Sequence, residues 1–103
     1  MEAPDPMAPP HRTARPSPDQ AVYAISVAAE LTGAPIQSIR LWERHGLLTP
    51  HRTPGGTRRY STNDLARITR ITALAGAGVN IAGIGSILDL EDTNAALRAH
   101  HDT

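Results

Sequence analysis

The alternation of apolar and polar positions predicts a helix over residues 36–45. Ile36, Ile39 and Trp42 recur at three-residue spacing, so their side chains can share one buried face. Gly46 follows as a residue that readily ends a helix. We therefore predict an apolar edge packed on a core and an opposite, arginine-bearing edge. The faces away from the core carry Gln37, Ser38, Arg40, Leu41 and Arg44.

A shorter helix is expected just before this one. Residues 22–26 alternate as a short extended segment, and Ser26 has the side chain of an N-cap for a helix over 27–32, which Gly33 ends. Only a Gly-Ala-Pro turn then separates the two helices. Two short helices joined in this way describe a helix-turn-helix, whose second helix enters the major groove of DNA.

Residues 49–60 predict a β-hairpin. The turn signal is Pro54-Gly55-Gly56, and short extended arms flank it. Two strands this short are not stable alone, so the hairpin must rest on the helices through Leu48 and part of Tyr60. We expect Tyr60 to be half-buried, with its hydroxyl free for a phosphate. The candidate DNA contacts of this wing are Arg52, Thr57, Arg58, Arg59 and Tyr60.

Two further helices are predicted after the hairpin. Ser61 and Asp64 have the spacing of a capping box, which opens a helix over residues 62–77. Its apolar stripe is Leu65, Ile68, Ile71 (or Thr72) and Leu74 or Ala75. Asn80 then caps a second helix, whose inward positions are Ile81, Ile84, Ile87 and Leu88.

The last predicted helix contains Gly83 and Gly85, which weaken a helix unless a close neighbour requires small residues. Leu90 and Leu97 follow one heptad apart, which is too little for a coiled coil of three or four heptads. We expect a mainly α fold in three parts. These are a disordered, proline-rich arm (1–21), a domain over 22–90, and a short helical or disordered tail (91–103).

Composition excludes several classes of protein. The chain has no cysteine, which rules out disulfides and thiolate sites, and it has no apolar run long enough for a membrane span. It also lacks a secretory signal pattern, so we expect a cytoplasmic, nucleoid-associated protein. His100-His101 has no third ligand at suitable spacing, and no nucleophile motif or phosphate-binding loop is present. We therefore predict no enzyme activity, metal site or cofactor.

The charge is zero overall but unevenly distributed. Residues 36–70 hold seven arginines against two carboxylates, whereas residues 80–103 hold one arginine against four. A localised positive region beside an acidic tail is typical of a small DNA-binding domain. The alternative is a solvated helix face on which Glu43 neutralises Arg40 and Arg44.

Several blocks of the chain resemble MerR-type transcriptional regulators, over residues 22–90. The blocks are Ile25–Ala29, Ile39–Leu48, Gly55–Ser61, Asp64-Leu65 and Gly78–Ile84. The glycine-rich hairpin and the last block are especially similar to the HspR branch, repressors of chaperone operons in heat-shock control. The resemblance implies a winged helix-turn-helix with a second, helical wing. It also implies recognition-helix contacts by Arg40 and Arg44, and first-wing contacts by Arg58, Arg59 and Tyr60.

We therefore expect a sequence-specific DNA-binding regulator, and specifically a repressor, with double-stranded DNA as its partner. Affinity would come mainly from phosphate contacts and specificity from the helix at 36–45. Two binding modes stay open, a weak homodimer on an inverted repeat and side-by-side binding on direct repeats. The resemblance also suggests a chaperone corepressor. The alternative function is a protein-interaction module on the same scaffold.

Overall fold

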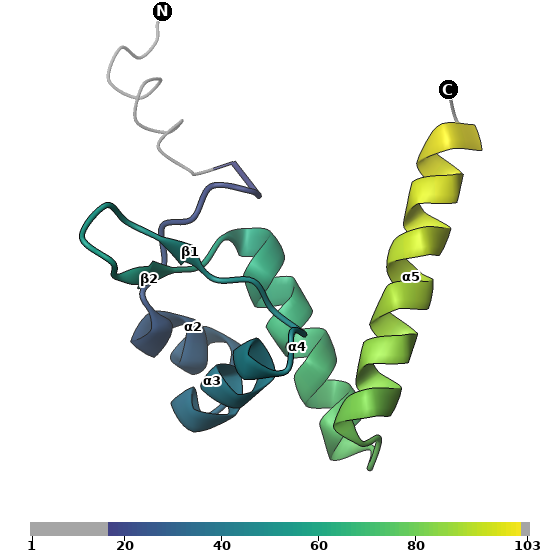
Figure 1. The fold of residues 1–103 in the computed structure, drawn as a ribbon, viewed down its shortest axis with the longest axis horizontal. Coiled ribbons are helices and arrows are strands. Elements are labelled where there is room, and N and C mark those ends of the chain that lie inside the picture. The colour runs from purple at the N-terminus through teal and green to yellow at the C-terminus, as the bar shows by residue number, and fades with distance from the viewer. Residues whose placement is uncertain (1–16, 102–103) are drawn as a thin grey trace, which may run out of the picture.

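The computed structural model describes residues 17–101. That part of the chain contains four helices and a short hairpin at one edge, which is the mainly α architecture predicted from the sequence (Figure 1). In chain order the elements are α2 (Ile25–Thr32), α3 (Ile36–Arg44), β1 (His51–Arg52), β2 (Arg58–Arg59), α4 (Thr62–Gly76) and α5 (Ile81–His101). No helix of this part is long and apolar enough to cross a membrane.

The first two helices form the expected helix-turn-helix. The predicted cap at Ser26 is wrong, because α2 already begins at Ile25 and Ala24 occupies the N-cap position without a side-chain hydrogen bond. The cause is tertiary: the backbone of Tyr23 pairs with that of Tyr60, which fixes the chain immediately before the helix. The predicted α3 is confirmed, with Gly46 just beyond its end at a φ of 78°.

The hairpin pairs β1 with β2 in antiparallel register, His51 with Arg59 and Arg52 with Arg58. The prediction that it rests on the helices through Leu48 and Tyr60 is confirmed, since these residues are 4% and 1% exposed. Tyr60 is therefore more deeply buried than the half-exposed residue expected from the sequence. The hairpin lies over α2 and α3 in Figure 1.

The capping box at the start of α4 is confirmed. The backbone N–H of Ser61 donates to a carboxylate oxygen of Asp64 at 2.8 Å, and the Asp64 N–H donates to Ser61 Oγ at 3.0 Å. The predicted apolar stripe turns Ile68, Ile71 and Leu74 into the core. The other core members are Ala28, Ala34, Ile39, Trp42, Leu47, Leu48, Tyr60, Ile84 and Leu88.

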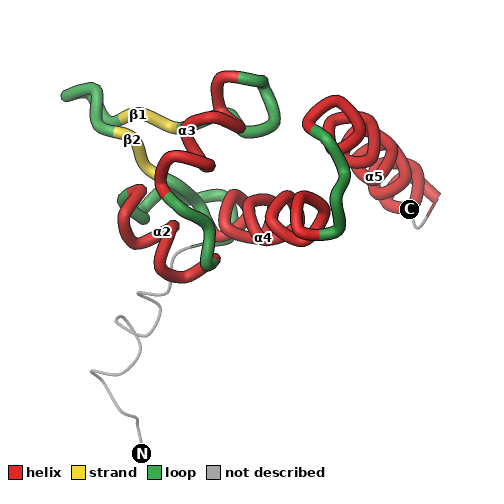
Figure 2. The backbone as a smooth tube through the Cα atoms, turned by 90° about the horizontal axis from the view of Figure 1, so that it is seen from below, coloured by secondary structure: helices red, strands yellow, loops and turns green. Residues whose placement is uncertain are grey.

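The last helix, α5, runs without a break through the expected boundary after Leu90. Asn80 caps it as predicted, accepting from the Gly83 N–H at 2.8 Å. Both helical glycines have close neighbours: a methyl group at Gly83 would lie 2.9 Å from Val79 Cγ1, and one at Gly85 would lie 3.4 Å from Leu47 Cδ2. Figure 2 shows α5 diverging from α4 beyond the turn that joins them.

The expected disorder of the arm falls mostly on residues 1–16, which lie outside the described residues. The described remainder, from Ser17, is held in place. Its Pro18 carbonyl accepts from the Asn63 N–H at the start of α4, at 2.9 Å, and the N–H of Val22 donates to the Tyr60 carbonyl at 3.0 Å. The folded part of the chain therefore begins before the predicted boundary at residue 22.

Candidate nucleic-acid interface

The arginine-bearing edge of α3 is presented to solvent. Ile39 and Trp42 are buried on the opposite edge, so helical geometry leaves Gln37, Arg40 and Arg44 exposed. Within residues 17–101, neither Arg40 nor Arg44 forms a salt bridge. The remaining predicted contacts of the helix, Ser38 and Leu41, are half-buried.

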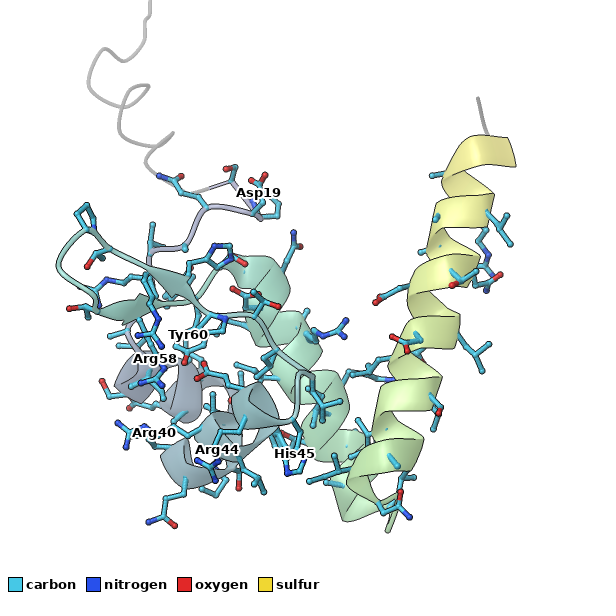
Figure 3. All side chains as sticks on the ribbon, viewed as in Figure 1. Asp19, Arg40, Arg44, His45, Arg58 and Tyr60 are labelled. Atoms are coloured by element: carbon cyan, nitrogen blue, oxygen red, sulfur yellow. The ribbon has the colours of Figure 1, made fainter. Side chains whose placement is uncertain are left out.

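A basic pocket lies between α3 and the hairpin. It has a volume of about 290 Å³ and is lined by Arg40, Glu43, Arg44, Pro50, Arg52 and Arg58. Four of its six lining residues are thus arginines, against one carboxylate. Figure 3 shows the labelled Arg40, Arg44 and Arg58 on the side of the molecule away from α5. Such a concentration of positive charge in a concave surface favours a bound anion.

The carboxylate of Glu43 joins α3 to the hairpin. Its side chain is only 5% exposed; Arg58 Nε lies 2.9 Å from Glu43 Oε1, and the Tyr60 hydroxyl donates a hydrogen bond to Glu43 Oε2. The Arg58 contact is an ion pair too bent for a hydrogen bond. Burial, reinforced by the hydrogen bond from the hydroxyl to Glu43, raises the pKa of Tyr60.

This cluster corrects two expectations. The Tyr60 hydroxyl is not free for a phosphate, because it is buried and bonded to Glu43. Arg58 is held by the same carboxylate, and its predicted contact with DNA stays a prediction. Glu43 forms no salt bridge with Arg40 or Arg44 within residues 17–101. The alternative in which Glu43 neutralises these two arginines on a solvated helix face is therefore wrong. Only the position of Glu43, beside the buried Trp42, hinted at this role in the sequence.

The wing presents its arginines on two sides. Arg52 and Arg58 stand directly opposite each other across the hairpin, an arrangement of like charges that destabilises a strand pair. The nearby Glu43 offsets this repulsion. Arg52 is exposed and donates from Nη1 to the Gly56 carbonyl at 3.2 Å, whereas Arg59 is half-buried and donates to the Arg58 carbonyl at 3.2 Å. Both bonds are to backbone oxygens, and neither guanidinium pairs with a carboxylate of residues 17–101.

The structure brings together only part of the predicted set. Arg40, Arg44, Arg52 and Arg58 share the basic pocket. The predicted contacts outside it are Gln37, Ser38, Leu41, Thr57, Arg59 and Tyr60. Thr57 is exposed beside the hairpin turn. Within the described ranges, no group of three or more His, Asp or Glu side chains is arranged to hold a metal.

Arg67 and Arg70 do not belong to the positive surface. Arg67 Nη1 lies 3.2 Å from Asp92 Oδ2, and Arg70 Nη2 lies 2.7 Å from Glu91 Oε2. The hydrogen bond between the second pair lowers the pKa of Glu91 and raises that of Arg70. The acidic stretch of α5 therefore neutralises α4, and the unneutralised arginines concentrate on α3 and the hairpin.

Comparisons with known proteins agree on one family. The model of the MerR HTH family of regulatory proteins matches residues 23–91. A Streptomyces coelicolor protein with the provisional name heat shock protein HspR is 44% identical over 79% of this chain, and the transcriptional repressor CarH of Myxococcus xanthus is 43% identical over 64%. The matches cover 54% and 22% of those proteins, so this chain corresponds to about half or less of their length.

A solved structure supports the same assignment. The crystal structure of a MerR-family transcriptional regulator from Bacillus cereus superimposes with a TM-score of 0.63 at 28% sequence identity. The superposition covers 77% of this chain and 61% of that one. The predicted winged helix-turn-helix is thus confirmed as a fold.

Proposed function

The chain belongs to the MerR family of helix-turn-helix, DNA-binding transcriptional regulators, which are not enzymes, and from that premise we propose that it is a sequence-specific repressor. The observation that carries the proposal is the exposed, unneutralised arginine edge of α3 beside a basic pocket. Repression is supported by the likeness to CarH, which is named a repressor, and a heat-shock role by the likeness to HspR. Such a protein would act in the cytoplasm, at the nucleoid.

In this proposal α3 reads bases in the major groove. Its exposed side chains are Gln37, Arg40 and Arg44, spaced three and four residues apart and so on neighbouring positions of one face. Arginine can donate two parallel hydrogen bonds to the edge of a guanine, and glutamine can do the same with adenine. Ser38 and Leu41 border this face and would make shorter-range contacts at its edge.

The hairpin supplies phosphate contacts. Arg52, Thr57 and Arg59 reach solvent from both sides of the wing, and their positive and hydrogen-bonding groups suit phosphate oxygens. The basic pocket would take one phosphate between α3 and the wing, with Arg58 at its edge. Tyr60 would act indirectly, because its hydroxyl fixes Glu43 rather than facing DNA.

Substitution of Arg40 tests base reading. The selected site is the duplex that the protein prefers when it is offered random sequences. Arg40→Ala should weaken binding to this site by about 1–3 kcal/mol and relax the preference at one base pair, because a bidentate base contact is lost. The matched control is Arg98→Ala, which removes an exposed arginine from the far part of α5. Binding of both variants to selected and random duplexes would be measured by fluorescence anisotropy. An equal loss on both duplexes would refute base reading by Arg40.

The assembly on DNA has a structural candidate. Leu90 and Leu97 lie one heptad apart on α5 and are 69% and 57% exposed. The exposure of these two apolar side chains, which a second copy would bury, supports the weak dimer on an inverted repeat over side-by-side binding. Sedimentation of the free protein, with Leu90→Ser as a variant, tests this. A monomer at all concentrations, with footprints on direct repeats, would instead establish the side-by-side mode.

A further inference from the structure

Arg67 connects three helices through one guanidinium group. Its Nε donates to the carbonyl oxygen of Leu47 at 2.6 Å, and its Nη1 lies 3.2 Å from Asp92 Oδ2. Arg67 projects from α4, Leu47 follows α3, and Asp92 belongs to α5. The side chain is 30% exposed, so both contacts are partly shielded from water.

Leu47 attaches the C-terminal end of α3 to α4 and α5, in addition to the core contacts of Ile39 and Trp42. Its N–H donates to the Trp42 carbonyl at 2.9 Å, which ties it to the last turn of the helix. Its side chain is buried and lies against Gly85 of α5. Movement of the C-terminal end of α3 relative to α4 must therefore stretch the bond from Arg67 to Leu47.

The two contacts of Arg67 differ in strength. A charged donor bonded to a backbone carbonyl is stronger than a neutral hydrogen bond, and a cation near the end of a helix also stabilises its dipole. The Asp92 carboxylate is 63% exposed, so its ion pair is weaker and is screened by salt. Because no side chain caps the N-terminus of α3, the position of the helix depends more on the contacts at its C-terminal end.

We propose that Arg67 is a positioning residue for DNA recognition, which fixes the angle of α3 by holding Leu47. The inference rests on the proposed function, because α3 is taken as the reading helix. The N-terminal residues of a recognition helix contact base edges. A pivot at the C-terminal end therefore changes the position of these residues in the groove, although Arg67 itself does not touch DNA.

The experiment compares Arg67→Ala with Arg70→Ala. Arg70 is a matched control, because it lies one turn away on α4 and pairs with α5 through Glu91 but has no bond to the α3 end. The affinity of the full chain for its selected site and for random DNA is measured over a range of salt concentrations, well below the melting temperature. Acrylamide quenching of Trp42, the single tryptophan, reports the packing of α3 without DNA.

For Arg67→Ala we expect about a tenfold loss of affinity for the selected site, from the value of a charge-assisted hydrogen bond. The salt dependence should stay unchanged, and Trp42 should become more accessible to quencher. The affinity and the Trp42 quenching of Arg67→Lys should fall between those of Arg67→Ala and the unmodified protein, since an ammonium group can still donate to the Leu47 carbonyl. Arg70→Ala should change affinity and quenching by less than about twofold, consistent with an exposed ion pair.

Three results would overturn the inference. A fall of about one in the salt slope would make Arg67 a direct phosphate contact. An equal effect of Arg70→Ala would indicate only general support of α5 on α4. Unchanged Trp42 quenching in Arg67→Ala would show that α3 is held without it. If the unmodified protein binds no duplex selectively, the proposed function fails, whereas the quenching comparison still decides whether Arg67 holds α3.

Discussion

Replacement of Tyr60 by phenylalanine should destabilise the fold without removing a DNA contact. Tyr60 is 1% exposed, and its hydroxyl donates to the nearly buried carboxylate of Glu43. A hydrogen bond to a charged group contributes about 1.5–3 kcal/mol. Glu43 keeps its ion pair with Arg58 at 2.9 Å, so we expect a loss of about 2 kcal/mol in the free energy of unfolding, within that range.

The assay is thermal and urea unfolding followed by circular dichroism. A loss of 1 kcal/mol lowers the melting temperature of a domain of this size by roughly 4–8 °C, so Tm should fall by about 8–16 °C. Tyr23→Phe is the control, because within residues 17–101 the Tyr23 hydroxyl has no hydrogen bond. Its unfolding free energy should change by less than about 0.5 kcal/mol.

The pKa of Tyr60 adds a pH signature. Burial raises this pKa in the folded protein, so on going to alkaline pH the unfolded chain ionises first. The stability contributed by the neutral phenol is therefore complete below the ordinary tyrosine value of 10.0 and declines as the pH rises from there toward the folded pKa. Phenylalanine cannot ionise, so the difference in unfolding free energy between the unmodified protein and Tyr60→Phe should shrink as the pH rises above 10.0.

Two outcomes would refute this reasoning. One is a Tyr60→Phe protein with unchanged stability and reduced affinity for DNA, which would mean that the hydroxyl faces a phosphate in solution. The other is strict additivity of Tyr60→Phe and Glu43→Gln in a double-mutant cycle. Groups in contact typically show coupling of about 0.5–3 kcal/mol, so additivity would show that they do not interact.

The remaining predictions concern α4 and α5. Gly76→Ala should stabilise the protein by about 0.4–1 kcal/mol, because nothing lies within 4 Å of the added methyl group. Gly83→Ala should show no such gain or should destabilise the protein, because its methyl group would lie 2.9 Å from Val79. Urea unfolding of the two variants compares them directly. The pKa of Glu91 is lowered, first by the hydrogen bond from Arg70, so its contribution is present above the ordinary value of 4.5 and is lost as the pH falls through the lower, folded value. Hydrogen exchange in α5 should therefore differ between Glu91→Gln and the unmodified protein at neutral pH and converge in acid, and a constant difference down to the lowest pH would contradict the ion pair.

Local signals were sufficient for the elements that surround the interface. The apolar spacing of α3, the glycine turn of the hairpin and the capping box of α4 each depend on residues close in sequence, and each was predicted correctly. The cap at Ser26 failed because a distant strand contact, between Tyr23 and Tyr60, fixes the chain first. A local preference thus gave way to tertiary pairing.

The engagement of the arginines could not be predicted, because their partners are distant. Arg70 reaches Glu91 across 21 positions, and Arg67 reaches Asp92 across 25. Spacing within one segment carries no information on such pairs. The sequence correctly indicated a localised excess of arginine, but only the packing of α5 on α4 and of the hairpin on α3 reveals which arginines are neutralised. The roles proposed for Arg40, Arg44 and the wing residues stay predictions.

The pairing of α5 carboxylates with α4 has a consequence for how the protein meets its target. Within residues 17–101, the arginines of α3 and the hairpin gather at one end, whereas those of α4 are neutralised by α5, so the positive charge of this part of the protein is unevenly distributed. In the field of a polyanion such a molecule turns its basic end forward before contact. Productive collisions are thereby favoured without the indiscriminate adhesion that a uniformly cationic surface would bring.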